Sequence, residues 1–269
     1  METVQGIRRI SLPGSTLKHD ERVNVFWLDA GGGILVDVGW DTDQSFSALQ
    51  EALPHPPRHV LITHLHPDHA GGVNRVRAWT DGEIYLPRED IPVGGSDLPP
   101  DVLYFEDEQP LTLSGVHVQV VLTPGHTPGH RCFVFSESGG LVTGDMVLGE
   151  GTTWVGPPHG DMADYLASLE RLRTLGHRFL CPGHGPIQTD PVEKIDAFIA
   201  HRLMRERQVL DSLGEGISAP TAIVARNYAE TPAYLHPLAE IVVRAHLQKL
   251  QKEGRVRQDD DRFSLVSPA

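Results

Sequence analysis

The sequence contains little cysteine and no long run of apolar residues. Cys132 and Cys181 are the only cysteines among 269 residues, too few to cross-link a chain of this size. No segment approaches the roughly 18 consecutive apolar residues of a membrane span, and residues 1–13 lack the basic and then apolar layout of a secretory signal. We therefore expect a cytoplasmic protein with a packed core and no membrane partner.

Positive charge is also scarce. The formal net charge is -13, but residues 1–199 carry 13 Lys and Arg against 27 Asp and Glu, whereas residues 200–269 carry 10 against 9. This distribution excludes binding of nucleic acid through bulk charge in the larger part of the chain. Histidine is abundant instead, with 15 residues. Since histidine is the commonest metal ligand, the positions of these residues indicate where a metal site could lie.

Alternating strand and helix patterns predict an α/β body. Apolar strands are expected at 23–28, 34–39, 60–63, 83–86, 116–122, 132–136, 141–143 and 179–181. Helices are expected at 45–53, after a cap at Asp161, and from 191 to about 213. The stretch 91–110 is rich in Pro, Gly and Asp, which predicts a loop.

The end of the chain predicts a different, smaller domain. Helices around 205–213 and 221–228 precede a third helix, in which four apolar residues share one face: Leu235, Leu238, Val242 and Ala245. A hairpin is then expected over 256–266, which completes a winged-helix layout. We predict a catalytic domain at 1–200 and a winged-helix domain at 201–269.

The third helix and the hairpin, or wing, leave two roles open. Their basic residues permit nucleic-acid binding: Arg244, Lys249, Lys252, Arg255 and Arg257. Three acidic residues at 259–261 occupy the wing tip, however, and favour a module used for packing or dimerisation.

Histidines and aspartates gather at the ends of predicted strands. The motif His64-x-His66-x-Asp68-His69 directly follows one strand, and three more polar residues follow later strands: His126, Asp145 and His184. Zinc takes three or four imidazole or carboxylate ligands at about 2.0–2.2 Å, so seven side chains match two ions if one is shared. A carboxylate such as Asp145 suits the shared position because its two oxygens can each bind one ion. Zinc is the first choice, with manganese or iron also compatible.

Competing catalytic motifs are missing from the sequence. It has no Gly-x-Ser-x-Gly, no phosphate-binding Gly-rich loop with Lys, and no Cys-x-x-Cys pair. We assign no function to the isolated histidines at positions 55, 117, 177 and 201.

The seven residues together resemble the motifs of the metallo-β-lactamase fold superfamily, over about residues 20–190. The resemblance implies a four-layered αββα sandwich with a dinuclear site on one edge. It implies one metal held by His64, His66 and His126, and a second held by Asp68, His69 and His184, with Asp145 bridging. It also implies that Asp37 orients ligand imidazoles from behind. His130 is either a second such residue, a pocket-lining residue or a purely structural one.

Segments further along the chain resemble a narrower group, the β-lactamase-like protein 2 group, which appends a winged helix to this fold. They are Gly149-Glu150-Gly151-Thr152-Thr153, Cys181 to Pro186, Thr231-Pro232, Leu235-His236, and the residues from His246 to Gly254. This resemblance spans nearly the whole chain and implies endonuclease activity on single-stranded RNA.

Three functions remain open from the sequence. Two adjacent divalent ions activate a water to hydroxide, which predicts a hydrolase in which Asp68 orients or deprotonates that water. The substrate is single-stranded RNA or, by resemblance to glyoxalase II and related thioesterases, a small acyl compound such as a thioester or lactone. The third possibility is a winged-helix nucleic-acid-binding protein with a vestigial metal site.

Overall fold

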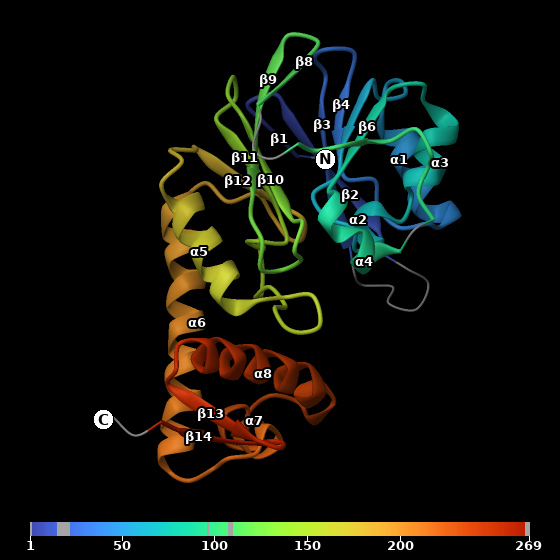
Figure 1. Ribbon diagram of the computed structural model, residues 1–269. Helices are drawn as coiled ribbons and strands as arrows, with labels where there is room; N and C mark the ends of the chain where they lie inside the picture. The colour runs from blue at the N-terminus through green and yellow to red at the C-terminus, as the bar shows by residue number, and fades with distance from the viewer. Residues whose placement is uncertain (1, 15–21, 96, 107–109, 267–269) are drawn as a thin grey trace.

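The computed structural model describes residues 2–14, 22–95, 97–106 and 110–266. Two β-sheets lie face to face with helices on both outer faces, and a small helical module follows below them (Figure 1). The prediction of an α/β, four-layered αββα sandwich with a C-terminal winged helix is confirmed.

The first sheet has seven strands in chain order. They are β1 (Glu2–Val4), β2 (Ile7–Pro13), β3 (Arg22–Leu28), β4 (Ile34–Val36), β5 (His59–Leu61), β6 (Glu83–Leu86) and β7 (Leu103–Tyr104). Pairing is antiparallel from β1 to β4 and parallel from β4 to β7. Side chains of β3 alternate between two cores, because Val25 and Trp27 face the outer helices whereas Phe26 faces the second sheet.

Two helices cover the outer face of the first sheet. They are α1 (Asp43–Ala52) and α3 (Val73–Trp79), which pack Leu49 and Val76 against the strands. Thr42 begins α1 because its hydroxyl accepts a hydrogen bond from the Ser45 amide at 3.1 Å.

The second sheet has five strands, in the order β12-β11-β10-β9-β8. Their bounds are β8 (Leu111–Leu113), β9 (Val116–Leu122), β10 (Arg131–Phe135), β11 (Gly140–Gly144) and β12 (Phe179–Pro182). The helices α5 (Met162–Arg173) and α6 (Pro191–Gly214) cover its outer face. The predicted cap of α5 is present, since the Asp161 carboxylate accepts from the amides of Ala163 and Asp164.

The C-terminal module consists of the second half of α6, α7 (Pro220–Asn227), a short 3-10 turn at Ala233–Leu235, α8 (His236–Lys252) and a hairpin of β13 (Val256–Asp259) with β14 (Arg262–Leu265). The position of the predicted domain boundary, residue 200, falls inside α6. This helix packs Ile195 and Phe198 into the catalytic core and Val209 and Leu213 into the module.

The expected apolar face of α8 is only partly buried. Leu238 is 49% exposed, whereas Val243 and Leu247, on another side of the helix, fill the core of the module. Ala245 packs instead into the core shared with α5 and the second sheet. The prediction of one apolar face on this helix was wrong, because α8 is buried on two sides.

The stretch 91–110 is less irregular than its composition indicates. Within its described residues it contains the short helix α4 (Ile91–Gly94) and the strand β7, which extends the first sheet. Across the described ranges, no helix has the combination of length and apolarity that crossing a lipid bilayer demands.

Candidate metal centre

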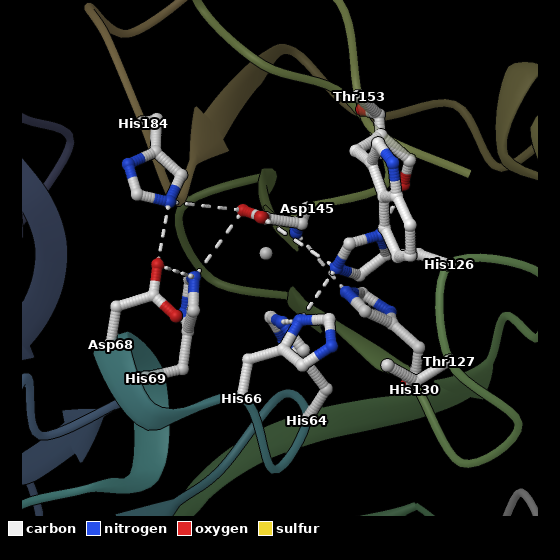
Figure 2. A network of polar contacts seen from close by, with 12 residues as sticks. His64, His66, Asp68, His69, His126, Thr127, His130, Asp145, Thr153 and His184 are labelled. Carbon is white, nitrogen blue, oxygen red and sulfur yellow. Dashed lines mark hydrogen bonds and ion pairs between the residues drawn. The ribbon is translucent and has the colours of Figure 1, made fainter. Parts of the chain in front are cut away.

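The seven predicted ligands come together at one edge of the sandwich. His64 and His66 follow β5, and Asp68 and His69 lie on the short helix α2 (Pro67–Ala70). His126 lies in the loop from β9 to β10, Asp145 directly follows β11, and His184 follows β12. Figure 2 shows all seven side chains pointing toward a common centre.

Three histidines form the first group. The Nδ1 atom of His66 lies 3.0 Å from Nε2 of His64 and 3.0 Å from Nε2 of His126. Burial lowers the pKa of His64 well below its ordinary value, lowers that of His66 to about 4, and lowers that of His126. These three rings are therefore neutral at pH 7. In a neutral ring one nitrogen carries no proton, and that nitrogen can bind a metal ion.

A second group consists of Asp68, His69 and His184. Oδ2 of Asp68 lies 3.2 Å from Nε2 of His184 and 3.7 Å from Nε2 of His69. The side chains of Asp68 and His184 remain 20% and 25% exposed, so solvent reaches the site on this side.

Asp145 lies between the two groups, as Figure 2 shows. Its Oδ1 is 3.4 Å from Nε2 of His69 and 3.6 Å from Nε2 of His184, while its Oδ2 is 3.7 Å from Nε2 of His126. One carboxylate therefore presents one oxygen to each group, which is the geometry of a bridge.

Charge is distributed unevenly over the site. Burial opposes a charged His69, yet Asp68, Asp145 and Asp37 together raise its pKa well above the ordinary value. Burial also opposes a charged His184, yet Asp145 and Asp68 raise its pKa in the same way. Despite burial, His69 and His184 lower the pKa of the Asp145 carboxyl. The second group thus favours bound positive charge, which a divalent cation can supply in place of protons.

Backbone and side-chain oxygens fix the outer nitrogen of four ligand rings. Nδ1 of His69 donates to Asp37, and that of His64 to the Thr63 hydroxyl. Nδ1 of His126 donates to the carbonyl of Trp154 at 2.7 Å, and that of His184 to the carbonyl of Arg22 at 2.8 Å. With these protons outside, the Nε2 atoms of all four rings point inward, the orientation that metal ligation requires.

The structure places Asp37 behind the predicted ligand His69. Oδ2 of Asp37 lies 2.8 Å from Nδ1 of His69, and the carboxylate also accepts from the amide and hydroxyl of Thr63. Asp37 adopts a φ of 60°, a conformation that non-glycine residues rarely take. The surrounding contacts hold this strained residue in position.

Both ring nitrogens of His130 have hydrogen-bond partners, so neither is available to bind a metal ion. Its Nε2 accepts a hydrogen bond from the backbone amide of Asp145 at 3.1 Å, and its Nδ1 lies 2.9 Å from the hydroxyl of Thr123. Burial lowers its pKa well below the ordinary value, so the ring is neutral. His130 therefore positions the backbone of Asp145.

Sequence reasoning missed Asp90, which ties two ligand loops together. Its buried carboxylate accepts from the amide of Leu65, next to His64, and from Thr127 and the amide of Gly129 in the His126 loop. Burial raises the pKa of the Asp90 carboxyl, although these three hydrogen bonds act to lower it. Asp90 stands in a Pro/Asp-rich turn without any repeating pattern, so only its position just after a strand could have indicated a role.

Asn24 is a second residue that the sequence did not indicate. It is buried in β3, and its side-chain amide donates to the carbonyls of Pro182 and Gly185 at 2.9 and 2.7 Å. These bonds hold the turn that carries His184. A Cβ at Gly183 in this turn would approach Oδ1 of Asp145 to 2.6 Å, so the close approach requires glycine.

The donor set fits divalent metal ions. Nε2 of His69 and Oδ1 of Asp145 are buried without a hydrogen-bond partner among the described residues. Such atoms are costly to leave unsatisfied, at about 1–3 kcal/mol each. Three groups have ligand atoms within 4.8 Å of one another: His64/His66/His126, His64/His69/Asp145 and Asp68/His69/His184.

Family comparisons divide the chain into two parts. The profile of the Metallo-beta-lactamase superfamily matches residues 20–184, and that of the Beta-lactamase associated winged helix domain matches residues 219–264. A "Beta-lactamase-like protein 2 homolog" of Drosophila melanogaster is 34% identical over 264 residues, covering 91% of this chain and 88% of the relative. An "Atrochrysone carboxyl ACP thioesterase" of Aspergillus fumigatus is 36% identical over 159 residues, covering 57% of this chain and 46% of that protein.

Solved structures are similar as well. A metallo-beta-lactamase family protein from Thermus thermophilus has a TM-score of 0.80 at 24% identity, covering 97% of this chain and 99% of that one. The protein TTHA1623, solved in a di-iron-bound form, has a TM-score of 0.55 at 29% identity and covers 64% of this chain and 92% of that one. The first similarity concerns the fold alone; the second extends to a protein that holds two metal ions.

Proposed function

The chain belongs to the metallo-β-lactamase superfamily, a hydrolytic and metal-dependent family, and from this premise we propose that it hydrolyses acyl thioesters at a centre of two divalent ions. The position of Asp145 supports the proposal, since one carboxylate faces both groups of predicted ligands and its buried Oδ1 has ion-pair contacts but no hydrogen-bond partner among the described residues. Zinc remains the first candidate, with manganese and iron as alternatives that imidazole and carboxylate also bind.

Each side chain has a defined part in this reaction. His64, His66 and His126 would hold one ion, Asp68, His69 and His184 the other, with Asp145 shared. When bound, two such ions would activate a water and polarise the carbonyl of the substrate. Burial opposes ionisation of Asp68, but His69 and His184 lower its pKa below the ordinary value, and its partial exposure lets it orient the attacking water.

The basic residues of the C-terminal module favour a small acyl substrate over RNA. Arg244 pairs with Glu240 and Asp261, and Lys249 pairs with Glu206 and Glu253. Lys252 pairs with Asp161 and Arg255 with Glu206 and Glu253, whereas Arg257 donates to the hydroxyl of Ser264. Basic side chains already neutralised in this way contribute little to binding a phosphate backbone.

A panel of substrates tests the proposal. Purified protein would be incubated with acyl-pantetheine thioesters, lactones and single-stranded RNA, with and without chelator. We expect thioester hydrolysis that chelator and Asp68→Ala abolish, and that Asp164→Asn, a change at an exposed aspartate of α5, leaves unchanged. Chelator-sensitive cleavage of RNA without thioester hydrolysis would instead support the endoribonuclease hypothesis. Nucleic-acid binding without any hydrolysis would support a vestigial site.

Cellular location is part of the same proposal. Cys132 and Cys181 are both free and buried, which is compatible with a reducing compartment. We therefore retain the cytoplasm as the proposed location.

A further inference from the structure

The segment from Gly149 to Asp161, here called the support loop, lies between the metal centre and the winged-helix module. On the side of the centre, its Trp154 carbonyl accepts the Nδ1 proton of His126 at 2.7 Å. The amide of Asp161 donates to the carbonyl of Gly125 at 2.8 Å, next to the same ligand. Figure 2 shows Thr153 of this loop on the His126 side of the cluster. The loop therefore determines where His126 lies and which nitrogen it presents.

On its other side the support loop is held by Arg202 of α6. The guanidinium donates to the carbonyl of Thr153, the residue before Trp154, and it lies over the ring of Tyr165 at 5.4 Å. The Tyr165 hydroxyl in turn donates to the carbonyl of Met146, next to Asp145, at 2.7 Å. Arg202 thus contacts two segments that each bond a residue at or next to a predicted ligand: the support loop bonds His126, and Tyr165 bonds Met146, which follows Asp145.

Burial makes Arg202 an unusual residue. Only 2% of it is exposed, and no carboxylate among the described residues forms an ion pair with it. A buried guanidinium without a carboxylate is costly, and its Nε has no hydrogen-bond partner within the described part of the chain. A neutral apolar residue would fill this position at lower cost if packing were its only role.

The helix α8 supports the loop from a second direction. A Cβ at Gly156 would lie 2.5 Å from Cγ2 of Ile241, so the loop backbone rests directly against α8. Lys252 at the end of α8 pairs with Asp161 at the end of the loop. In a winged-helix module the third helix is the one available to read DNA, but here one side of it faces the catalytic domain (Figure 1).

We infer that α6 and the winged-helix module it leads into are a positioning element for the metal centre, and that Arg202, in the middle of α6, is the principal positioning residue. Arg202 holds the Thr153–Trp154 backbone, and the Trp154 carbonyl then fixes the ring of His126. This inference rests on the proposed two-metal centre and adds a role for the module. It predicts that a change in α6 or the module weakens one metal site without altering a predicted ligand.

Metal retention tests the inference directly. Wild-type protein, Arg202→Gln and a matched control, Arg205→Gln, would be dialysed against graded chelator, and metal per chain would be measured. Arg205 lies on the same helix but bonds the carbonyl of Asn227 and stacks on Tyr228, both within the module. Outer residues that orient a ligand typically change metal affinity about 10- to 100-fold. We expect Arg202→Gln to lose one of two ions at about tenfold lower chelator concentration, with Arg205→Gln like the wild type.

A conservative variant and a spectrum separate positioning from loss of folding. Arg202→Lys retains a donor for the Thr153 carbonyl and should restore most of the affinity. In cobalt-substituted protein, Arg202→Gln should shift the visible absorption bands of the first group, which report ligand geometry. If wild type binds no metal, the proposed function fails. If wild type binds two ions and Arg202→Gln retains both like Arg205→Gln, with unchanged spectra, the positioning role is wrong.

Discussion

The Asp145 carboxylate faces His69 and His126 with different oxygens, at 3.4 Å from Oδ1 to Nε2 and 3.7 Å from Oδ2 to Nε2. These two histidines belong to different groups, and one follows β5 while the other follows β9. A single residue at the end of β11 therefore joins ligands that come from both sheets. The sandwich brings these strand ends to one edge, and the site depends on that arrangement.

Replacing the Asp145 carboxylate tests whether it joins the two proposed metal sites. Asp145→Asn keeps one carbonyl oxygen but substitutes an amide for the other, so it cannot bridge. We expect metal content to fall from about two ions per chain to about one, and hydrolysis to fall at least about 100-fold, since one cation supplies several kcal/mol of charge stabilisation. Metal analysis and initial rates measure both effects. Two ions retained at full activity would exclude the bridging role.

Asp37 should control metal affinity from behind the ligands. Asp37→Asn weakens the acceptor of the His69 Nδ1 proton, so we expect about 10- to 100-fold weaker binding of one ion. Asp29→Asn, at an exposed aspartate outside the site, is the control. Competition with a chromogenic chelator gives the affinities, and equal values for the two variants would show that Asp37 does not orient His69.

Asp90 should matter for stability more than for ligation. Asp90→Ala leaves the amides of Leu65 and Gly129 and the hydroxyl of Thr127 without their acceptor, at about 1–3 kcal/mol for each buried group left unpaired. We expect urea unfolding to give a free energy of unfolding lower by about 3 kcal/mol or more. Asp101→Ala, which removes the carboxylate of an exposed residue paired with Arg77, should cost less than about 1 kcal/mol. Similar losses of unfolding free energy in Asp90→Ala and Asp101→Ala would contradict the role of Asp90 in holding the two loops together.

Side-chain patterns predicted which residues converge at the site but not the groups that hold these residues in place. The motif from His64 to His69 follows an apolar strand, so alternation and strand ends located it in advance. Trp154 and Arg22 act through backbone carbonyls, which every residue carries, so their side chains gave no indication. Asp90 contacts residues 25 to 39 positions away along the chain, a relation that only the fold creates.

Tertiary packing also limited what the sequence could predict about the fold. The αββα order followed from strands interleaved with helices together with the family resemblance. The two buried sides of α8 did not follow, because Leu238 and Ala245 have similar apolar character and only tertiary packing distinguishes them. The basic residues of the third helix were equally ambiguous, since several of their carboxylate partners lie on other elements.

A buried histidine in the module should make stability depend on pH. His246 is fully buried on α8, and neither ring nitrogen has a hydrogen-bond partner among the described residues. Burial is the main cause that lowers its pKa to about 3, and nearby positive groups lower it further. The charged and titratable groups around it are Arg202, Lys249, His201, Arg205 and, 4.0 Å from Nδ1, Glu206.

The sign of the effect is set by these values. An unfolded histidine takes up a proton near pH 6.5, whereas folded His246 does so only near pH 3, so stability is lost as pH falls through this window. The slope is about 1.4 kcal/mol per pH unit. We expect His246→Phe to reduce the loss between pH 6.5 and 5 by up to about 2 kcal/mol in urea unfolding. His117→Gln, which changes an exposed histidine, should leave this pH-dependent loss unchanged. An equal loss of stability in the wild type, His246→Phe and His117→Gln would contradict a neutral, buried His246.

Metal titration of the metal-free protein tests the central claim most directly. Acyl-thioester hydrolysis would be followed as zinc is added in steps to the wild type and to His66→Ala. Two ions held by seven convergent side chains predict that the wild-type rate rises to a plateau at about two zinc ions per chain, and that His66→Ala remains inactive at this ratio. Hydrolysis that is complete before metal is added, or identical in both proteins, would contradict the dinuclear account.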